Sequence, residues 1–170
     1  MQTPADTCSL DARQVTPDKE RNTSVQIPSG PAFSPSHLLW QVAQLGMAYA
    51  LALPVGWNRE KESHAAGIRT FPIIAVASCA LAMMAVSLPG ATPDTYSRIL
   101  QGLVTGIGFV GGGAILRSNS GVTGVATAAS VWSTGIAGAA VGLGLYHIAI
   151  VLTVLTYLTL RFLTPSAPPE

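Results

Sequence analysis

Long apolar stretches alternate with short polar segments along most of the chain. Three stretches, residues 38–55, 71–88 and 99–116, each run for 18 residues without a charged side chain. A helix needs about 20 predominantly apolar residues to cross the hydrocarbon core of a bilayer, so each stretch can supply one transmembrane helix. Buried core helices of a soluble protein could have the same length, but the chain leaves no amphipathic helices to cover them. The pattern therefore predicts an all-α membrane protein.

A fourth apolar stretch, residues 122–163, contains one charged residue, Arg161. It is about twice the length that a single span needs, and the Gly142-Leu143-Gly144 triplet is the natural place to divide it. We predict helices over 122–141 and 145–162, joined as an antiparallel hairpin, which makes about five spans in total. A four-span arrangement, with part of this region re-entrant, is the alternative.

Polar residues gather outside these helices and set the predicted domain boundaries. Residues 1–36 are rich in Ser, Thr and Pro and poor in large apolar side chains, which predicts a disordered tail. Residues 37–163 form the predicted helical membrane domain, and residues 164–170 form a short polar tail. Within the membrane domain, residues 118–124 (SNSGVTG) are predicted to form a loop.

The positions of Lys and Arg predict the orientation of the chain. With five alternating spans, one side of the membrane receives five of these residues from short loops and span ends, and the other receives only Arg98. The five are Arg59, Lys61, Arg69, Arg117 and Arg161. Since short cytoplasmic loops carry an excess of Lys and Arg, we predict that the amino terminus lies outside and the carboxyl terminus in the cytoplasm.

Composition excludes several classes of function. Charged residues make up 10% of the chain, against roughly 25% in an average soluble domain. The formal net charge is +1, and no basic stripe indicates nucleic-acid binding. The predicted spans contain no carboxylate, which argues against a direct path for a hard dication. Ser130 and Ser133 have no base nearby in the sequence, so we predict that the protein is not an enzyme. No Cys-x-x-Cys motif or Cys/His cluster suggests a metal, and we expect no cofactor.

Small residues mark two of the predicted helices. In the third, Gly102 and Gly106 form one GxxxG pair, and Gly108 and Gly112 form another. In the fourth, small residues recur every four positions, at Ala126, Ser130, Thr134, Gly138 and Gly142. Because small residues let helix backbones approach closely in lipid, we predict that these two helices pack against each other through these faces. The alternative is that glycine is simply common in membrane helices.

The adjacent Gly111, Gly112 and Gly113 permit a second interpretation. Each glycine weakens a helix by roughly 1 kcal/mol relative to alanine, so the run could open a kink of the kind that lines transporter sites. Close packing is the simpler interpretation of the same residues.

The loop over residues 56–70 is the most polar part of the predicted membrane domain. At its end, Thr70 is placed to cap the second helix, and Pro72 suits the first helical turn. Arg69 is unfavourable to the helix dipole at this position, which suggests that it serves a partner, a lipid head group or Glu60.

Two segments, taken in order, resemble the MgtC/SapB family of bacterial inner-membrane proteins. Residues 56–81 (GWNREKESHAAGIRTFPIIAVASCAL) are similar to the family pattern Gly-x-x-Arg-Glu followed by Ala-Gly-x-Arg-Thr. Residues 102–146 are similar to its glycine-rich helix, the arginine after it, the Gly-x-x-Thr-Ala-Ala-Ser-x-Trp block and the Gly-x-Gly-x-Tyr ending. The resemblance covers roughly residues 38–163. Its motif falls on Arg59, Glu60, Gly67, Arg69, Thr70, Gly111, Gly113, Arg117, Gly124, Thr127, Ala128, Ala129, Trp132 and Tyr146.

The resemblance implies a multi-pass inner-membrane domain of four or five spans. Members of the family are associated with growth at low magnesium, and the best-studied ones bind the membrane part of F-type ATP synthase and damp it. An older view made them magnesium transporters. We therefore expect a non-enzymatic regulatory protein that binds a membrane complex or its own copies, and a small transporter or channel is the alternative.

Two departures from the family limit what the resemblance carries over. Many relatives have an acidic residue where this chain has Asn58, so a cation or proton role at that position is not expected here. Several members also carry a soluble carboxyl-terminal domain, and we expect this chain to lack the regulation attributed to it.

Overall fold

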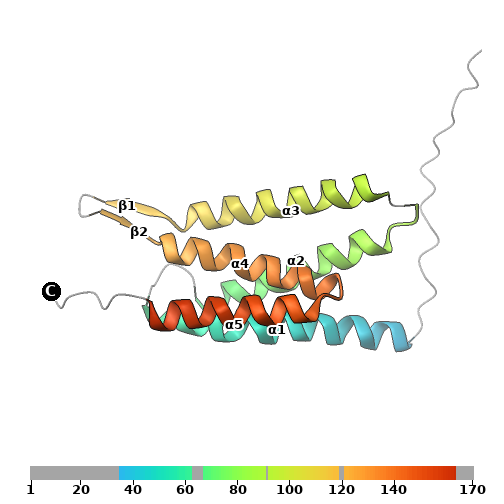
Figure 1. Cartoon of the computed structure of the whole chain (residues 1–170), viewed down its shortest axis with the longest axis horizontal. Helices are drawn as coiled ribbons and strands as arrows, with labels where there is room; N and C mark the ends of the chain where they lie inside the picture. Colours follow the sequence, from blue (N-terminus) through green and yellow to red (C-terminus); the bar gives the residue numbers. More distant parts are fainter. Residues whose placement is uncertain (1–34, 63–66, 91, 119–120, 164–170) are drawn as a thin grey trace, which may run out of the picture. The chain divides into compact units, whose positions relative to one another are not determined.

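The computed structural model describes residues 35–62, 67–90, 92–118 and 121–163, and within these residues it confirms the predicted all-α fold (Figure 1). Five helices and one short hairpin make up the described chain. They are α1 (Pro35–Glu62), α2 (Thr70–Ser87), α3 (Pro93–Gly113), β1 (Leu116–Ser118), β2 (Gly121–Thr123), α4 (Val125–Gly142) and α5 (Tyr146–Phe162). The predicted tails lie outside the described residues, except that residues 35 and 36 begin α1.

Three of the described helices, α1, α2 and α4, are long and apolar enough to cross a membrane. They have 28, 18 and 18 residues. Helix α5 is a shorter apolar helix of 17 residues. Helix α3 begins earlier than the predicted span, because Thr92 caps it and Pro93 occupies its first turn, so its amino-terminal end includes the exposed Asp94–Arg98 ion pair.

Helix α4 lies at the centre of the bundle, because each of the other four helices packs against it. The core around it is built largely from small side chains, including Ala48 and Ala52 of α1 and Ala75 of α2. Larger side chains fill the remaining space, of which Phe71 and Val141 are completely buried. Alanine-rich surfaces let helices approach closely, which is the usual source of association between helices in lipid.

The predicted break between the last two helices is confirmed at Gly144. This glycine has a φ of +77°, a left-handed conformation that glycine adopts without strain. The backbone N–H of Leu145 donates to the carbonyl oxygen of Ala140 at 2.8 Å and closes the turn. Helices α4 and α5 therefore form the expected antiparallel hairpin.

The predicted loop over residues 118–124 is instead largely a short β-hairpin. Strands β1 and β2 pair antiparallel, with Leu116 opposite Thr123 and Arg117 opposite Val122. Residues 119–120, at its tip, lie outside the described residues. The hairpin returns the chain from the end of α3 to the start of α4, so that these two helices lie side by side.

The predicted contact between the glycine motifs of α3 and the small face of α4 is wrong in this chain. A Cβ added to Gly102, Gly106, Gly108, Gly112 or Gly113 would meet no atom within 4 Å. Helix α3 packs on α4 through a different face, which includes Ile107 against Gly135 and Gly111 against the carbonyl oxygen of Ala128. A bulky Ile107 seated on a glycine makes this contact, so the GxxxG pairs are left at the surface.

The small face of α4 is packed chiefly against α2 instead. Added Cβ atoms on Gly138 and Gly142 would meet Ala75 and Ala82 at 2.8 and 2.9 Å. Since the contacts advance together along both helices, α2 and α4 run in the same direction. Helix α2 offers no glycine, but its alanines expose enough backbone to accept the α4 glycines.

Candidate functional site

The two ends of the helical bundle differ in charge. One end (left in Figure 1) contains the end of α1, the start of α2, the hairpin, the start of α4 and the end of α5. This end holds five of the described Lys and Arg residues, namely Arg59, Lys61, Arg69, Arg117 and Arg161. The opposite end holds one, Arg98. The fold thus gathers the cations that the sequence assigned to one side, and we call this the basic end.

Arg59 is a buried charge in the last turns of α1. Only 3% of its surface is exposed, and its guanidinium forms an ion pair with Glu62. A second guanidinium contact reaches Oδ1 of Asn58 at 3.5 Å, and Nε has no hydrogen-bond partner. A cation suits the carboxyl end of a helix, where the carbonyl dipoles point outward. The sequence placed Arg59 in a polar loop, whereas α1 continues through it and turns it inward.

Glu60 holds the segment that leads into α2. Its carboxylate Oε2 accepts a hydrogen bond from the backbone N–H of Ile68 at 2.6 Å. Gly67 lies directly against this carboxylate, since an added Cβ would come within 2.6 Å of Oε2. Gly56, one turn earlier in α1, leaves similar room for the backbone of Ile68 and the side chain of Phe71. Gly56 lies in the segment that resembles the family pattern but is not among the predicted site residues.

The expected roles of Thr70 and Arg69 change accordingly. The N-cap of α2 is Arg69 and no side chain caps it, so the prediction that Thr70 caps the helix is wrong. Instead, the backbone N–H groups of Thr70 and Phe71 donate to the carbonyl oxygen of Gly67. In the described chain Arg69 forms no ion pair, and its side chain is exposed, so Glu60 is not its partner.

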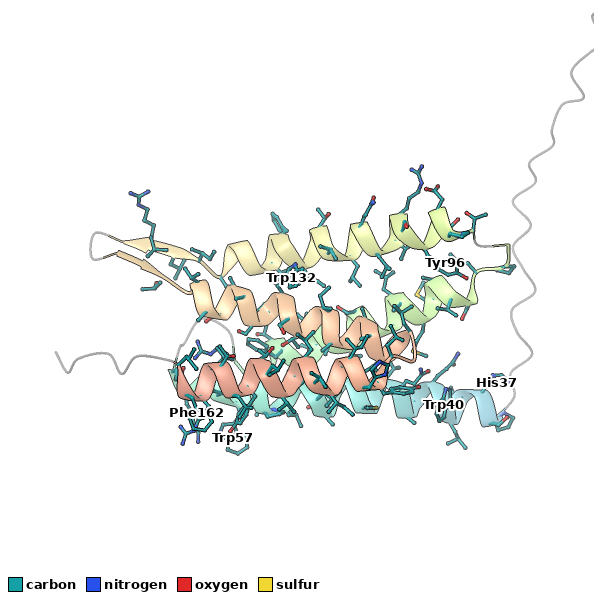
Figure 2. The ribbon with its side chains drawn as sticks, in the orientation of Figure 1. His37, Trp40, Trp57, Tyr96, Trp132 and Phe162 are labelled. Carbon is teal, nitrogen blue, oxygen red and sulfur yellow. The ribbon has the colours of Figure 1, made fainter. Side chains whose placement is uncertain are left out.

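The motif at the start of α4 divides into an inner and an outer face. Thr127, Ser130 and Thr134 are buried, with 1%, 1% and 5% of their surfaces exposed. Ser130 Oγ donates to the carbonyl oxygen of Thr127 at 2.8 Å, whereas Thr134 Oγ1 has no hydrogen-bond partner. Ala129 and Trp132 are exposed, and Trp132 is labelled in Figure 2.

Gly124 and Arg117 complete the basic end. Gly124 is the N-cap of α4 with a φ of +85°, and an added Cβ would lie 3.0 Å from the carbonyl carbon of Ala114. Glycine is therefore required by both conformation and space. Arg117 projects from β1 and is exposed.

Tyr146 belongs to the opposite end and forms a separate contact. Gln44 of α1 donates from Nε2 to the Tyr146 hydroxyl at 3.1 Å and to the carbonyl oxygen of Val141 at 3.3 Å. This contact fixes α1 to the α4–α5 turn. Sequence reasoning missed Gln44, although a glutamine within an apolar run is a signal for an interhelical hydrogen bond.

The described residues contain no group of three or more His, Cys, Asp or Glu side chains that could hold a metal ion. Exposed cations at the basic end, among them Lys61, Arg69 and Arg117, can contact anionic groups.

The sequence matches the MgtC family over residues 45–167. This chain belongs to the MgtC family. Together with the apolar helices, membership shows that it is a membrane protein. It is 35% identical over 134 residues to protein SrpB of Synechococcus elongatus, covering 68% of this chain and 74% of SrpB.

In two further relatives of this MgtC family member, the region that matches this chain is only about half of the protein. Protein SapB of Bacillus subtilis is 31% identical over 71% of this chain and 55% of its own length. Protein MgtC of Salmonella typhimurium is 32% identical over 67% of this chain and 48% of its own length. The chain therefore spans about half the length of these two relatives. No solved structure gives a significant match.

Proposed function

We propose that this protein is a non-enzymatic regulator in the bacterial inner membrane that binds another membrane complex through α3. The proposed physiological setting is growth at low magnesium, and the proposed partner is the membrane part of F-type ATP synthase. Both follow from the resemblance to the MgtC/SapB family. The orientation proposed with them places the basic end in the cytoplasm, in keeping with the positive-inside rule.

The observation that carries this proposal is the unoccupied glycine surface of α3. Each glycine costs a helix about 1 kcal/mol relative to alanine. Among the described residues, a neighbouring helix packs closely on α3 at Gly111, whereas a Cβ added to any of the other five α3 glycines would meet no atom within 4 Å. Their missing side chains leave room for a helix of another protein to approach closely. In lipid, such small-residue surfaces are a common means of helix association.

The two GxxxG pairs flank one outward-facing aromatic side chain. By the 100° helical repeat, Gly102 and Gly106 lie to one side of Phe109, and Gly108 and Gly112 lie to the other. Phe109 is 85% exposed. A partner helix could therefore lie in either shallow glycine channel and pack against Phe109. This geometry supports protein binding more directly than solute passage.

Co-purification from native membranes tests the proposal. The double substitution Gly106→Leu with Gly108→Leu fills both glycine channels and should reduce recovery of ATP synthase at least about tenfold, since a loss of 1.4 kcal/mol suffices. Ala77→Leu is the matched control, because Ala77 is a small exposed residue on α2. It should leave recovery unchanged.

Two outcomes would contradict the proposal. One is recovery of only the protein's own copies, with no ATP synthase or other complex. The other is reproducible Mg²⁺ flux into proteoliposomes that Gly112→Leu abolishes, which would favour the transporter alternative.

A further inference from the structure

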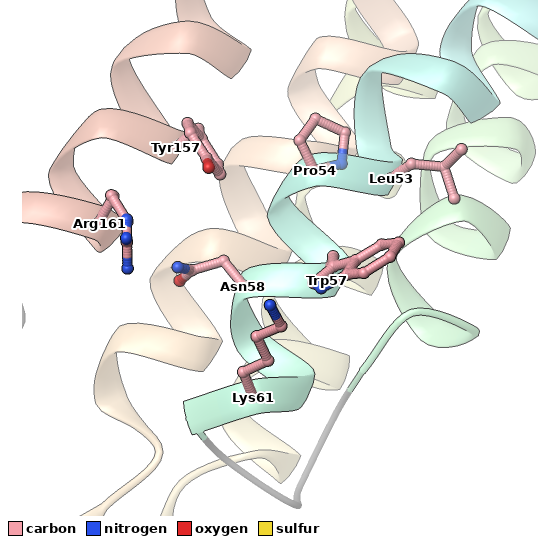
Figure 3. Close-up of a pocket in the computed structure, with 7 residues that line it drawn as sticks. All are labelled: Leu53, Pro54, Trp57, Asn58, Lys61, Tyr157 and Arg161. Carbon is pink, nitrogen blue, oxygen red and sulfur yellow. The ribbon is translucent and has the colours of Figure 1, made fainter.

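A pocket of about 380 Å³ lies between the last turns of α1 and α5 at the basic end (Figure 3). Helix α1 contributes Trp57, Asn58 and Lys61, and helix α5 contributes Tyr157 and Arg161. Both helices supply an aromatic residue followed four positions later by a cation. Each aromatic residue lies about one helical turn before its cation, so in both helices the charge is nearer the carboxyl-terminal end.

The cations in this pocket are not neutralised by the described part of the chain. Neither Lys61 nor Arg161 forms an ion pair there. The nearby carboxylates are engaged elsewhere, since Glu62 pairs with Arg59 and Glu60 accepts from Ile68. The Lys61 ammonium lies 5.4 Å from the centre of the Trp57 ring, a distance that suits a cation–π contact. The pocket thus concentrates positive charge beside an aromatic surface.

Hydrogen-bond donors lie among these cations. The Tyr157 hydroxyl and the Asn58 amide both line the pocket. Because Oδ1 of Asn58 faces the Arg59 guanidinium, its amide nitrogen is the group that can donate to an anion. A phosphate group offers several acceptor oxygens and matches guanidinium, ammonium, hydroxyl and amide donors together.

The location favours a lipid as the source of this phosphate. The pocket lies near the ends of two apolar helices, and its lining includes the apolar Leu53 and Pro54. Trp57 is 58% exposed, as expected for a tryptophan at the level of the lipid head groups. Basic pockets between membrane helices on the cytoplasmic side commonly bind anionic head groups.

We propose that this pocket binds the phosphate head group of an anionic phospholipid. Lys61 and Arg161 hold the phosphate, Asn58 and Tyr157 donate hydrogen bonds, and Trp57 contacts the glycerol region. The site is separate from the glycine surface of α3 and does not depend on the regulatory role proposed above.

Native mass spectrometry of the full chain in a neutral detergent tests this site. Phosphatidylglycerol should bind at least about tenfold more tightly than phosphatidylcholine, because Lys61 and Arg161 repel the choline cation that lies beside the phosphate of phosphatidylcholine. The double substitution Lys61→Gln with Arg161→Gln should remove that preference. Arg117→Gln is the matched control, because Arg117 is an exposed cation at the same end but outside the pocket.

A charge-conserving exchange separates loss of binding from loss of folding. Lys61→Arg combined with Arg161→Lys keeps both charges and should keep the preference for phosphatidylglycerol. Equal binding of the two lipids by the unmodified protein would overturn the proposal. An equal loss of the preference for phosphatidylglycerol in Arg117→Gln would also overturn it. So would binding of inorganic phosphate and glycerol phosphate by a protein that shows no preference between the two lipids.

Discussion

Gly138 of α4 lies directly against the backbone of Ala75 in α2. An added Cβ would come within 2.8 Å of both Cα and the carbonyl carbon of Ala75, closer than non-bonded carbon atoms approach. Backbone atoms cannot rotate away as a side chain would. This contact between α2 and α4 therefore requires a hydrogen atom in place of a side chain at position 138.

We expect Gly138→Ala to destabilise the folded protein in detergent by about 1–3 kcal/mol, because overpacking forces the two helices apart. Gly108→Ala is the control, since no atom lies within 4 Å of its added Cβ and alanine favours the helix by about 1 kcal/mol. Thermal unfolding followed by circular dichroism compares the two. Equal stability of both variants would show that α2 and α4 do not pack at this point.

The sequence predicts which face of α4 is small but not which helix packs against it. Periodicity places Ser130, Thr134 and Gly138 on one face, yet any neighbour with small residues could meet that face. The glycines of α3 gave the stronger signal, whereas the structure uses Ala75 and other alanines of α2. Alanine is too common in membrane helices to identify a partner by itself.

The sequence also fails to predict the end of α1, and with it the surroundings of Arg59. The predicted span ends at residue 55, where the uncharged apolar stretch ends. However, Glu, Lys and Arg are strong helix formers, so α1 continues to Glu62. The aromatic and cationic pairs at 57/61 and 157/161 are present in the sequence, but only the fold brings them together.

Removing Glu62 and removing Arg59 from their ion pair should have unequal effects on the stability of the protein. Arg59 is almost completely buried, whereas the Glu62 side chain is 29% exposed and can turn to water. Glu62→Gln leaves the buried charge of Arg59 without compensation. We expect this substitution to lower the free energy of unfolding by about 1–3 kcal/mol, which is less than the value for a deeply buried pair. Arg59→Met should cost less.

A double substitution at this pair provides the internal control. Arg59→Met combined with Glu62→Gln should be more stable than Glu62→Gln alone, because the uncompensated charge is gone. Thermal unfolding of the four proteins measures the coupling between the two side chains. Additive effects would mean that the pair contributes nothing to the fold.

Gly124→Ala should destabilise the protein through both strain and contact. A left-handed conformation costs a residue with a Cβ about 1–2 kcal/mol, and the Ala114 backbone adds an overlap. Gly144→Ala serves as a comparison, because Gly144 has a similar φ of +77° but no atom lies within 4 Å of its added Cβ. We expect Gly124→Ala to lower the midpoint of thermal unfolding further than Gly144→Ala. The reverse order would show that the Ala114 contact is unimportant.

The proposed orientation predicts which end of the bundle is accessible from outside the cell. Ser97 lies near the start of α3 at the end opposite the basic end, and Val122 lies in β2 at the basic end. Both are exposed. With Cys8 replaced by serine, Ser97→Cys should react with a membrane-impermeant maleimide in intact spheroplasts. Val122→Cys should react only after the membrane is permeabilised, because five cations favour retention of its end in the cytoplasm.

The native Cys79 supplies the background control for this experiment. Its side chain is completely buried, so the protein with only Cys8 replaced should remain unlabelled in intact spheroplasts. Reaction at Val122→Cys before permeabilisation, with protection of Ser97→Cys, would reverse the orientation. The anionic-lipid pocket between α1 and α5 would then face the outer leaflet, and its lipid partner would have to be sought there.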